Sequence, residues 1–170
     1  MKYPLRLAAI LAIVGIMAGC GEKLTEEQLR AKATEFEQQA RWEEAADTYE
    51  KLIKSYPNSE SIDKDLYKLA VIYANNLQEF EKSVDAYIRI VDEYPESQHV
   101  IQSTFMIGYR YANDMKEMDK AKTAYEQFLA KFPDHELASS VKWELDHLGQ
   151  DISEIDLQLD ENEVATDTEQ

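Results

Sequence analysis

The residues of this sequence that could do acid–base or metal chemistry are few and scattered. Three histidines stand far apart, without the mutual spacing of a metal-binding helix face: His99, His135 and His147. Paired carboxylates occur at Glu43-Glu44 and Asp160-Glu161, but nothing around them predicts a pocket that would separate their pKa values. Neither a glycine-rich phosphate loop nor a nucleophile-elbow serine is present in the sequence. We therefore expect no enzyme, no metal site and no cofactor, and solvated or helix-capping histidines.

The only cysteine, Cys20, follows a segment with the parts of a secretory signal. Lys2 and Arg6 make a basic start, residues 7–16 are apolar and uncharged, and small residues precede the cysteine. The apolar run is too short to cross a bilayer core of ~30 Å comfortably as a helix. A single cysteine also excludes an internal disulfide and a cysteine metal cluster.

The tetrapeptide Met17-Ala18-Gly19-Cys20 resembles the lipobox of bacterial lipoproteins, with methionine where leucine is commonest. The resemblance implies cleavage before Cys20 and lipidation of that residue; the alternative is an ordinary signal peptide followed by a free cysteine. Several acyl chains anchor a protein stably, because each buried CH₂ contributes about 0.8 kcal/mol. Gly21, where aspartate would suggest inner-membrane retention, favours the outer membrane by resemblance to enterobacterial sorting. We expect a signal peptide at 1–19, a lipidated linker at 20–25 and a folded part in the periplasm.

The charge of the chain limits its partners. With 34 acidic and 18 basic residues, the formal net charge is −16. Such a surface repels phosphate backbones, so we expect no nucleic-acid partner. The acidic surface is either simply solvated or a docking face for a basic partner.

The helices that would position any site are built on one sequence motif that occurs three times. Each copy has a small residue, an aromatic four positions later, an apolar residue three after that and a proline five further on. Copies are 38 residues apart, a period typical of repeat arrays in which each unit buries its apolar face on the next. The anchors are Ala45/Ser83/Ala121, Tyr49/Tyr87/Tyr125, Leu52/Ile90/Phe128 and Pro57/Pro95/Pro133.

Apolar periodicity predicts seven helices, two for each unit and one at the end. The expected pairs are 26–40 with 42–55, one opening near 61 with 80–94, and one opening near 99 with 119–132. A last helix at 137–148, capped by Asp134 and ended by Gly149, would cover the open end of the third unit. Thr25 and Gln28 form a capping box, and the prolines end the second helices. Gly108 inside a helix predicts a close helix–helix approach.

These residues resemble the tetratricopeptide repeat family over about residues 26–148. The match includes the small residue that faces the aromatic from the first helix, at Ala33, Ala70 and Gly108. The longer spacing is similar to the lipoprotein of the outer-membrane β-barrel assembly machine and to the repeats of the Tol-Pal cell-division coordinator. The former is longer and the latter has a coiled coil that is absent here. The resemblance implies an all-α fold: three tetratricopeptide-type helix pairs in a right-handed solenoid plus a C-terminal capping helix, spanning 26–149.

The resemblance also implies a concave groove, lined by the first helix of each pair, in which extended peptides or helices lie. Tyr67, Phe105 and Tyr109 are aromatics that the repeat pattern does not require, so they are candidate anchors for a partner. The alternative is that they pack against the neighbouring helix. The full set of family groove positions is Arg30, Thr34, Glu37, Tyr67, Val71, Asn75, Phe105, Tyr109 and Asn113.

The last segment, 150–170, is acidic and lacks basic residues, so we expect a largely disordered tail. It contains a short apolar set that could pack loosely or dock in a groove, its own or a partner's: Ile152, Ile155, Leu157 and Leu159. The sequence as a whole predicts a scaffold held at the outer membrane through Cys20 that binds an envelope protein or peptide and assists envelope assembly. A peptide- or ligand-binding transport accessory and a lipoprotein of secretion-pore or pilus assembly remain alternatives.

Overall fold

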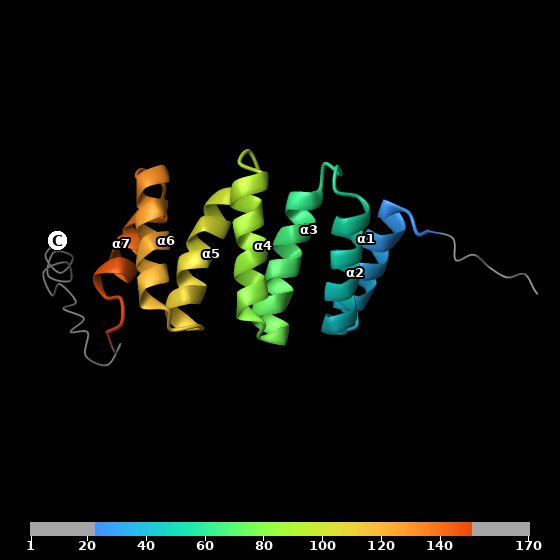
Figure 1. The fold of residues 1–170 in the computed structure, drawn as a ribbon, viewed down its shortest axis with the longest axis horizontal. Helices are drawn as coiled ribbons and strands as arrows, with labels where there is room; N and C mark the ends of the chain where they lie inside the picture. Colours follow the sequence, from blue (N-terminus) through green and yellow to red (C-terminus); the bar gives the residue numbers. More distant parts are fainter. Residues whose placement is uncertain (1–22, 151–170) are drawn as a thin grey trace, which may run out of the picture.

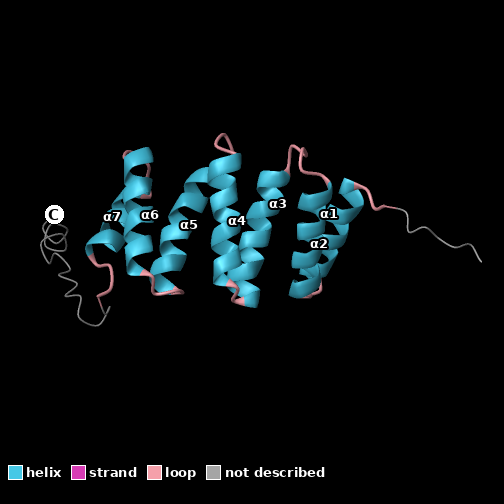
Figure 2. Cartoon of the chain, in the orientation of Figure 1, coloured by secondary structure: helices cyan, strands magenta, loops and turns pink. Residues whose placement is uncertain are grey.

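The computed structural model describes residues 23–150, which form helices and connecting turns without a strand in that range (Figure 2). The expected all-α architecture is confirmed. The elements are α1 Glu26–Gln38, α2 Trp42–Ser55, α3 Ile62–Ile72, the π-helical turn η1 Tyr73–Leu77, α4 Phe80–Glu93, α5 Val100–Asn113, α6 Met118–Lys131 and α7 Ala138–Asp146.

The helix pairs follow one another in one row, from α1 and α2 at one end to α7 at the other (Figure 1). Helix contacts connect successive elements along the chain, so each pair, α1/α2, α3/α4 and α5/α6, packs against the next one. This is the arrangement expected of a tetratricopeptide-type array, in which no unit buries its apolar face alone.

The repeat anchors form the core of every pair. Tyr49, Tyr87 and Tyr125 are at most 1% exposed. The small residues four positions earlier are completely buried, and positions four apart lie on one face of a helix. In the third pair the approach is closest, because a Cβ added to Gly108 would lie 2.5 Å from two ring carbons of Tyr125. The close approach predicted at Gly108 is therefore confirmed.

Each turn between one helix pair and the following pair has the same hydrogen-bonding pattern. Two residues after each proline, a side chain accepts a hydrogen bond from the backbone N–H two positions further on. The acceptors and distances are Ser59 to Ser61 at 3.3 Å, Ser97 to His99 at 3.0 Å and His135 Nδ1 to Leu137 at 3.2 Å.

The start of the last helix agrees with the prediction within one residue, but its capping residue was predicted wrongly. Leu137 is the N-cap residue of α7, and His135, not Asp134, is the polar side chain that bonds in this turn. Asp134 follows the proline directly and is exposed, so it stands one position too early to take part. The Thr25–Gln28 capping box of α1 is confirmed.

The turn inside each pair uses a left-handed backbone conformation two residues before the second helix. Ala40, Gln78 and Lys116 have φ values of 54°, 56° and 58°. Such values are uncommon in residues other than glycine. In the second pair, the chain leaves α3 through the π-helical turn η1, which contains Asn75 and Asn76.

Candidate partner-binding site

The predicted lipidation residue, Cys20, lies outside the described residues. The described chain starts at Lys23, three residues before α1 begins. Within residues 23–150 no helix has the length and apolar character needed to cross a bilayer.

All nine predicted groove residues lie on the first helices of the pairs: three on α1, three on α3 and η1, and three on α5. In the third unit the structure brings two of them together. The rings of Phe105 and Tyr109 are 6.0 Å apart, and both side chains are half-buried. Phe105 also lies 6.4 Å from the buried ring of Tyr125. Neighbouring Asn113 is exposed and its amide donates to the Tyr109 carbonyl at 3.2 Å.

Tyr67, the aromatic candidate of the second unit, packs between neighbouring elements. Its ring stacks on His99 at 4.5 Å and meets Tyr87 edge-on at 5.8 Å. It is half-buried, as is Val71 one turn later. These contacts connect α3 with α4 and with the turn before α5, so they help to fix the pairs relative to one another.

Arg30, a groove candidate of the first unit, binds across to the second unit. Its guanidinium Nη2 is 2.7 Å from Asp65 Oδ2, and Nε donates to the same carboxylate at 3.1 Å. Asp65 is 2% exposed, whereas Arg30 is 32% exposed. Hydrogen bonding to Asp65 raises the pKa of Arg30. Thr34, one turn along α1, is half-buried beside Arg30 in a shallow hollow of that helix.

Glu37 and Asn75 make similar bridges. Glu37 accepts from the Tyr49 hydroxyl and from Lys68 Nζ at 3.2 Å, and Lys68 also donates to the Tyr49 hydroxyl at 3.0 Å. The Asn75 side-chain oxygen accepts from Arg110 Nη2 at 2.9 Å. Arg30, Glu37 and Asn75 therefore brace adjacent units. The partners of these bridges, among them Arg110, were not predicted from the sequence.

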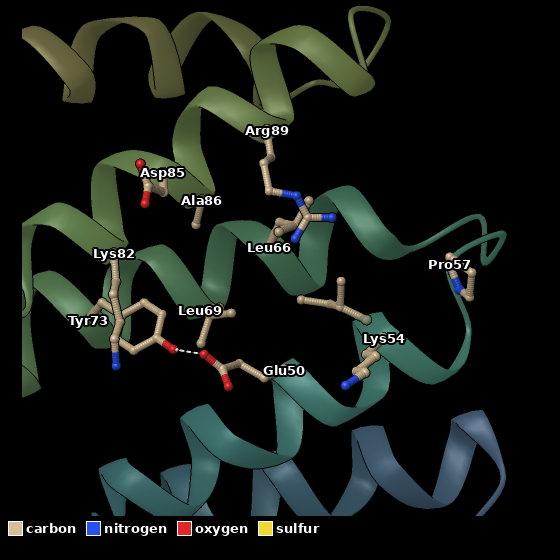
Figure 3. Close-up of a pocket in the computed structure, with 11 residues that line it drawn as sticks. Glu50, Lys54, Pro57, Leu66, Leu69, Tyr73, Lys82, Asp85, Ala86 and Arg89 are labelled. Carbon is tan, nitrogen blue, oxygen red and sulfur yellow. Dashed lines mark hydrogen bonds between the residues drawn. The ribbon is translucent and has the colours of Figure 1, made fainter.

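Two grooves that sequence reasoning missed lie between successive second helices. One is between α2 and α4, with α3 and η1 as its floor, and has a volume of about 470 Å³ (Figure 3). The other, between α4 and α6 over α5, has a volume of about 530 Å³. Most of their lining positions correspond at the 38-residue period; the pairs include Glu50/Ile88, Ile53/Val91, Leu69/Ile107, Tyr73/Tyr111 and Lys82/Lys120. The 38-residue period relates the lining positions of the two grooves to one another. It did not reveal the grooves, because the repeated motif identifies core positions and not the spaces between helices.

The two grooves differ in chemistry. In the first, the Tyr73 hydroxyl donates to Glu50, as Figure 3 shows, and Arg89 pairs with Glu93 at 3.0 Å. In the second, Ile88 takes the place of Glu50, so this position of the groove wall is apolar. Polar groups that are already paired leave the first groove less able to hold a partner.

The histidines make ring and turn contacts in the structure. His99 stacks on Tyr67, and His147 stacks on Trp143 at 4.5 Å. Within residues 23–150, no group of three or more histidine, cysteine or acidic side chains is placed to hold a metal ion.

The arrangement is thus an all-helical repeat array with half-exposed aromatics on its first helices and grooves between its second helices. No curated protein matches the chain. Residues 22–163, most of the chain, match the protein family described as YfiO, outer membrane lipoprotein. The expected kinship with outer-membrane assembly lipoproteins of tetratricopeptide type is confirmed, and the chain belongs to the YfiO family of outer membrane lipoproteins.

Proposed function

We propose that this protein is a lipid-anchored periplasmic scaffold, not an enzyme, that holds another envelope protein or a peptide at the outer membrane during envelope assembly. Membership of an outer membrane lipoprotein family supports the location. The lipobox-like tetrapeptide ending at Cys20 supports the anchor. Tethering raises the concentration of the scaffold near membrane-bound partners without any additional contact.

The Phe105–Tyr109 pair on α5 is the observation that carries the binding site. Two aromatic side chains lie beside one another, half-exposed, at positions that are not anchors of the repeat motif. Partly buried aromatics next to one another are the residues that most often supply binding energy at protein interfaces. Phe105 also supports the core through Tyr125, whereas Tyr109 is the residue of the pair that can be truncated with less effect on folding.

Tyr109→Ala tests this site, and Tyr111→Ala is its matched control. Tyr111 is also a tyrosine on α5, but it lines the groove between α4 and α6. Partners are captured by chemical crosslinking in intact cells and quantified by mass spectrometry. Tyr109→Ala should lower capture about tenfold or more, as expected for a hot-spot residue worth about 2 kcal/mol. Equal melting temperatures would show that the array is intact. Unchanged capture with Tyr109→Ala, or loss only with Tyr111→Ala, would contradict the assignment to the Phe105–Tyr109 pair.

Cys20→Ala tests the anchor separately. The variant should lose incorporation of radiolabelled palmitate and move from the membrane to the soluble fraction, because its acyl chains supply the membrane affinity. Cys20→Ser serves as a second variant with a different side chain. Retention of both variants in the outer-membrane fraction would contradict a lipid anchor without bearing on the α5 site.

A further inference from the structure

Helix α7 corresponds to the first helix of a fourth unit. Its Ala138 and Val141 are 5% and 0% exposed, and Leu145 packs against the cluster around Tyr125. These residues stand 38 positions after Val100, Ser103 and Ile107 of α5. Within the described residues no second helix follows α7, so the face that such a helix would cover has no partner there.

The open end exposes an aromatic side chain. Trp143 is 43% exposed and is the only exposed large hydrophobic side chain among residues 23–150. It stands at the 38-residue period from Tyr67 and Phe105, both of which are half-buried by neighbouring elements. A tryptophan exposed to this extent at the end of an array marks apolar surface that a terminal cap usually covers.

A pocket of about 480 Å³ lies beside Trp143, between α5, the start of α6 and α7. Its apolar lining comes from Tyr109, Met118, Trp143 and Leu148, and Lys116 stands at its edge. Gln150, the last described residue, also belongs to the lining. The chain that follows therefore starts at the pocket itself.

We propose that residues 151–159 of the same chain fold back into this pocket and cover Trp143, so that a partner bound at Tyr109, which also lines the pocket, must displace this segment. The segment contains the aliphatic residues Ile152, Ile155, Leu157 and Leu159, a concentration unlike the rest of the acidic tail. Nine extended residues reach about 30 Å, enough to cross the end of the array from Gln150. The family match extends through residue 163, so this segment belongs to the region that defines the family.

The negative charge of the tail segment also favours its binding in the pocket beside Trp143. Residues 151–163 include Asp151, Glu154 and Asp156 and no basic residue. Lys116 at the pocket edge and Lys142 on α7 form no ion pair within residues 23–150. An acidic segment with aliphatic side chains thus meets the apolar lining and Lys116 at its edge, while Glu144 is the one carboxylate in the lining, and attachment through Lys116 should weaken as ionic strength rises.

The test measures the exposure of Trp143 in the mature, full-length chain. Trp42→Phe leaves Trp143 as the only tryptophan, and its acrylamide quenching and emission maximum are recorded. Ile155→Ser with Leu157→Ser should increase quenching about twofold and shift the emission to the red, since burial of aliphatic surface drives docking. Val164→Ser, an apolar substitution in the same tail outside the segment, is the control and should change neither quantity.

Hydrogen exchange of α7 in the wild-type tryptophan background provides a second readout that does not depend on Trp42. Protection of residues 138–146 should fall in the Ile155→Ser, Leu157→Ser variant and not in Val164→Ser. Identical quenching and exchange in all three proteins would overturn the proposal. So would tail-dependent protection that disappears on dilution, because it would place the segment of one copy on another copy.

Discussion

At the scale of single residues, Gly108 has the tightest environment in the array. The first helices of the first and second pairs have alanine at the corresponding position, and both alanines are completely buried. Around Gly108 the ring of Tyr125 has moved into the space of the missing methyl group. The sequence predicted a close approach here, and the family resemblance implied that Gly108 faces the aromatic of its unit, but the distance to Tyr125 comes only from the structure, because the period aligns positions without giving distances.

Gly108→Ala should therefore destabilise the protein although alanine is the better helix former. Overpacking costs about 1–3 kcal/mol, and helix propensity returns up to ~1 kcal/mol, so a net loss of about 1 kcal/mol is expected. The measurement is the free energy of unfolding from urea denaturation. Ala70→Gly, the reverse change at the equivalent position of α3, should also destabilise. A Gly108→Ala protein as stable as the wild type would show that Tyr125 can move aside.

At the scale of elements, the junction between the first and second pairs depends on the bridge from α1 to α3. The bridge joins a half-buried guanidinium to a carboxylate that has almost no contact with solvent. Removing one partner of a buried pair is most costly when the remaining charge stays buried. The two ends of this bridge are therefore not equivalent.

Arg30→Ala should cost more stability than Asp65→Ala. Without Arg30, Asp65 would remain buried and unpaired, for a loss of about 3 kcal/mol, whereas Arg30 alone can turn toward water. Arg89→Ala, which removes an exposed pair with Glu93, should cost less than about 1 kcal/mol. Thermal unfolding of the three variants gives the ranking. An Asp65→Ala protein less stable than Arg30→Ala would contradict the burial argument.

The helices themselves were predicted better than the contacts between them. The bounds of α2 agree with the expected 42–55, and α4 and α6 agree within one residue, because each proline ends its helix at a fixed distance. The π-helical turn η1 was not predicted, since apolar periodicity does not distinguish a π-helical turn from an α-helical one. The bridges to Asp65 and Arg110 were also missed, because pairs about 35 residues apart depend on how the units pack.

At the scale of the whole molecule, each pair buries a tyrosine in its core. Burial raises the pKa of Tyr87 to about 12 from an ordinary value of 10.0, and it also raises the pKa of Tyr49 and Tyr125. The folded state thus favours the neutral hydroxyl. The resulting stabilisation is complete below pH 10 and is lost as the pH rises toward 12.

The array should therefore unfold cooperatively between about pH 10 and 12. Over this range the raised pKa of Tyr87 alone should lower the free energy of unfolding by about 3 kcal/mol. In one pH titration, the loss of helical circular dichroism should coincide with the rise in tyrosinate absorbance from the core tyrosines. Tyr87→Phe removes one of these groups and should move the midpoint to higher pH. Ionisation of the core tyrosines with the helical signal intact would contradict the prediction.

The single row of pairs has a mechanical consequence. Its two ends, α1 and α7, lie at opposite extremes of the molecule, and each pair contacts only its neighbours (Figure 1). A pull between an anchored amino terminus and a load at α7 would pass through every junction in series. The rupture force would then be that of the weakest junction and not the sum of all junctions. The contacts of Lys23 and Leu24 with Tyr56 at the end of α2 would be the first tertiary contacts to carry the tension.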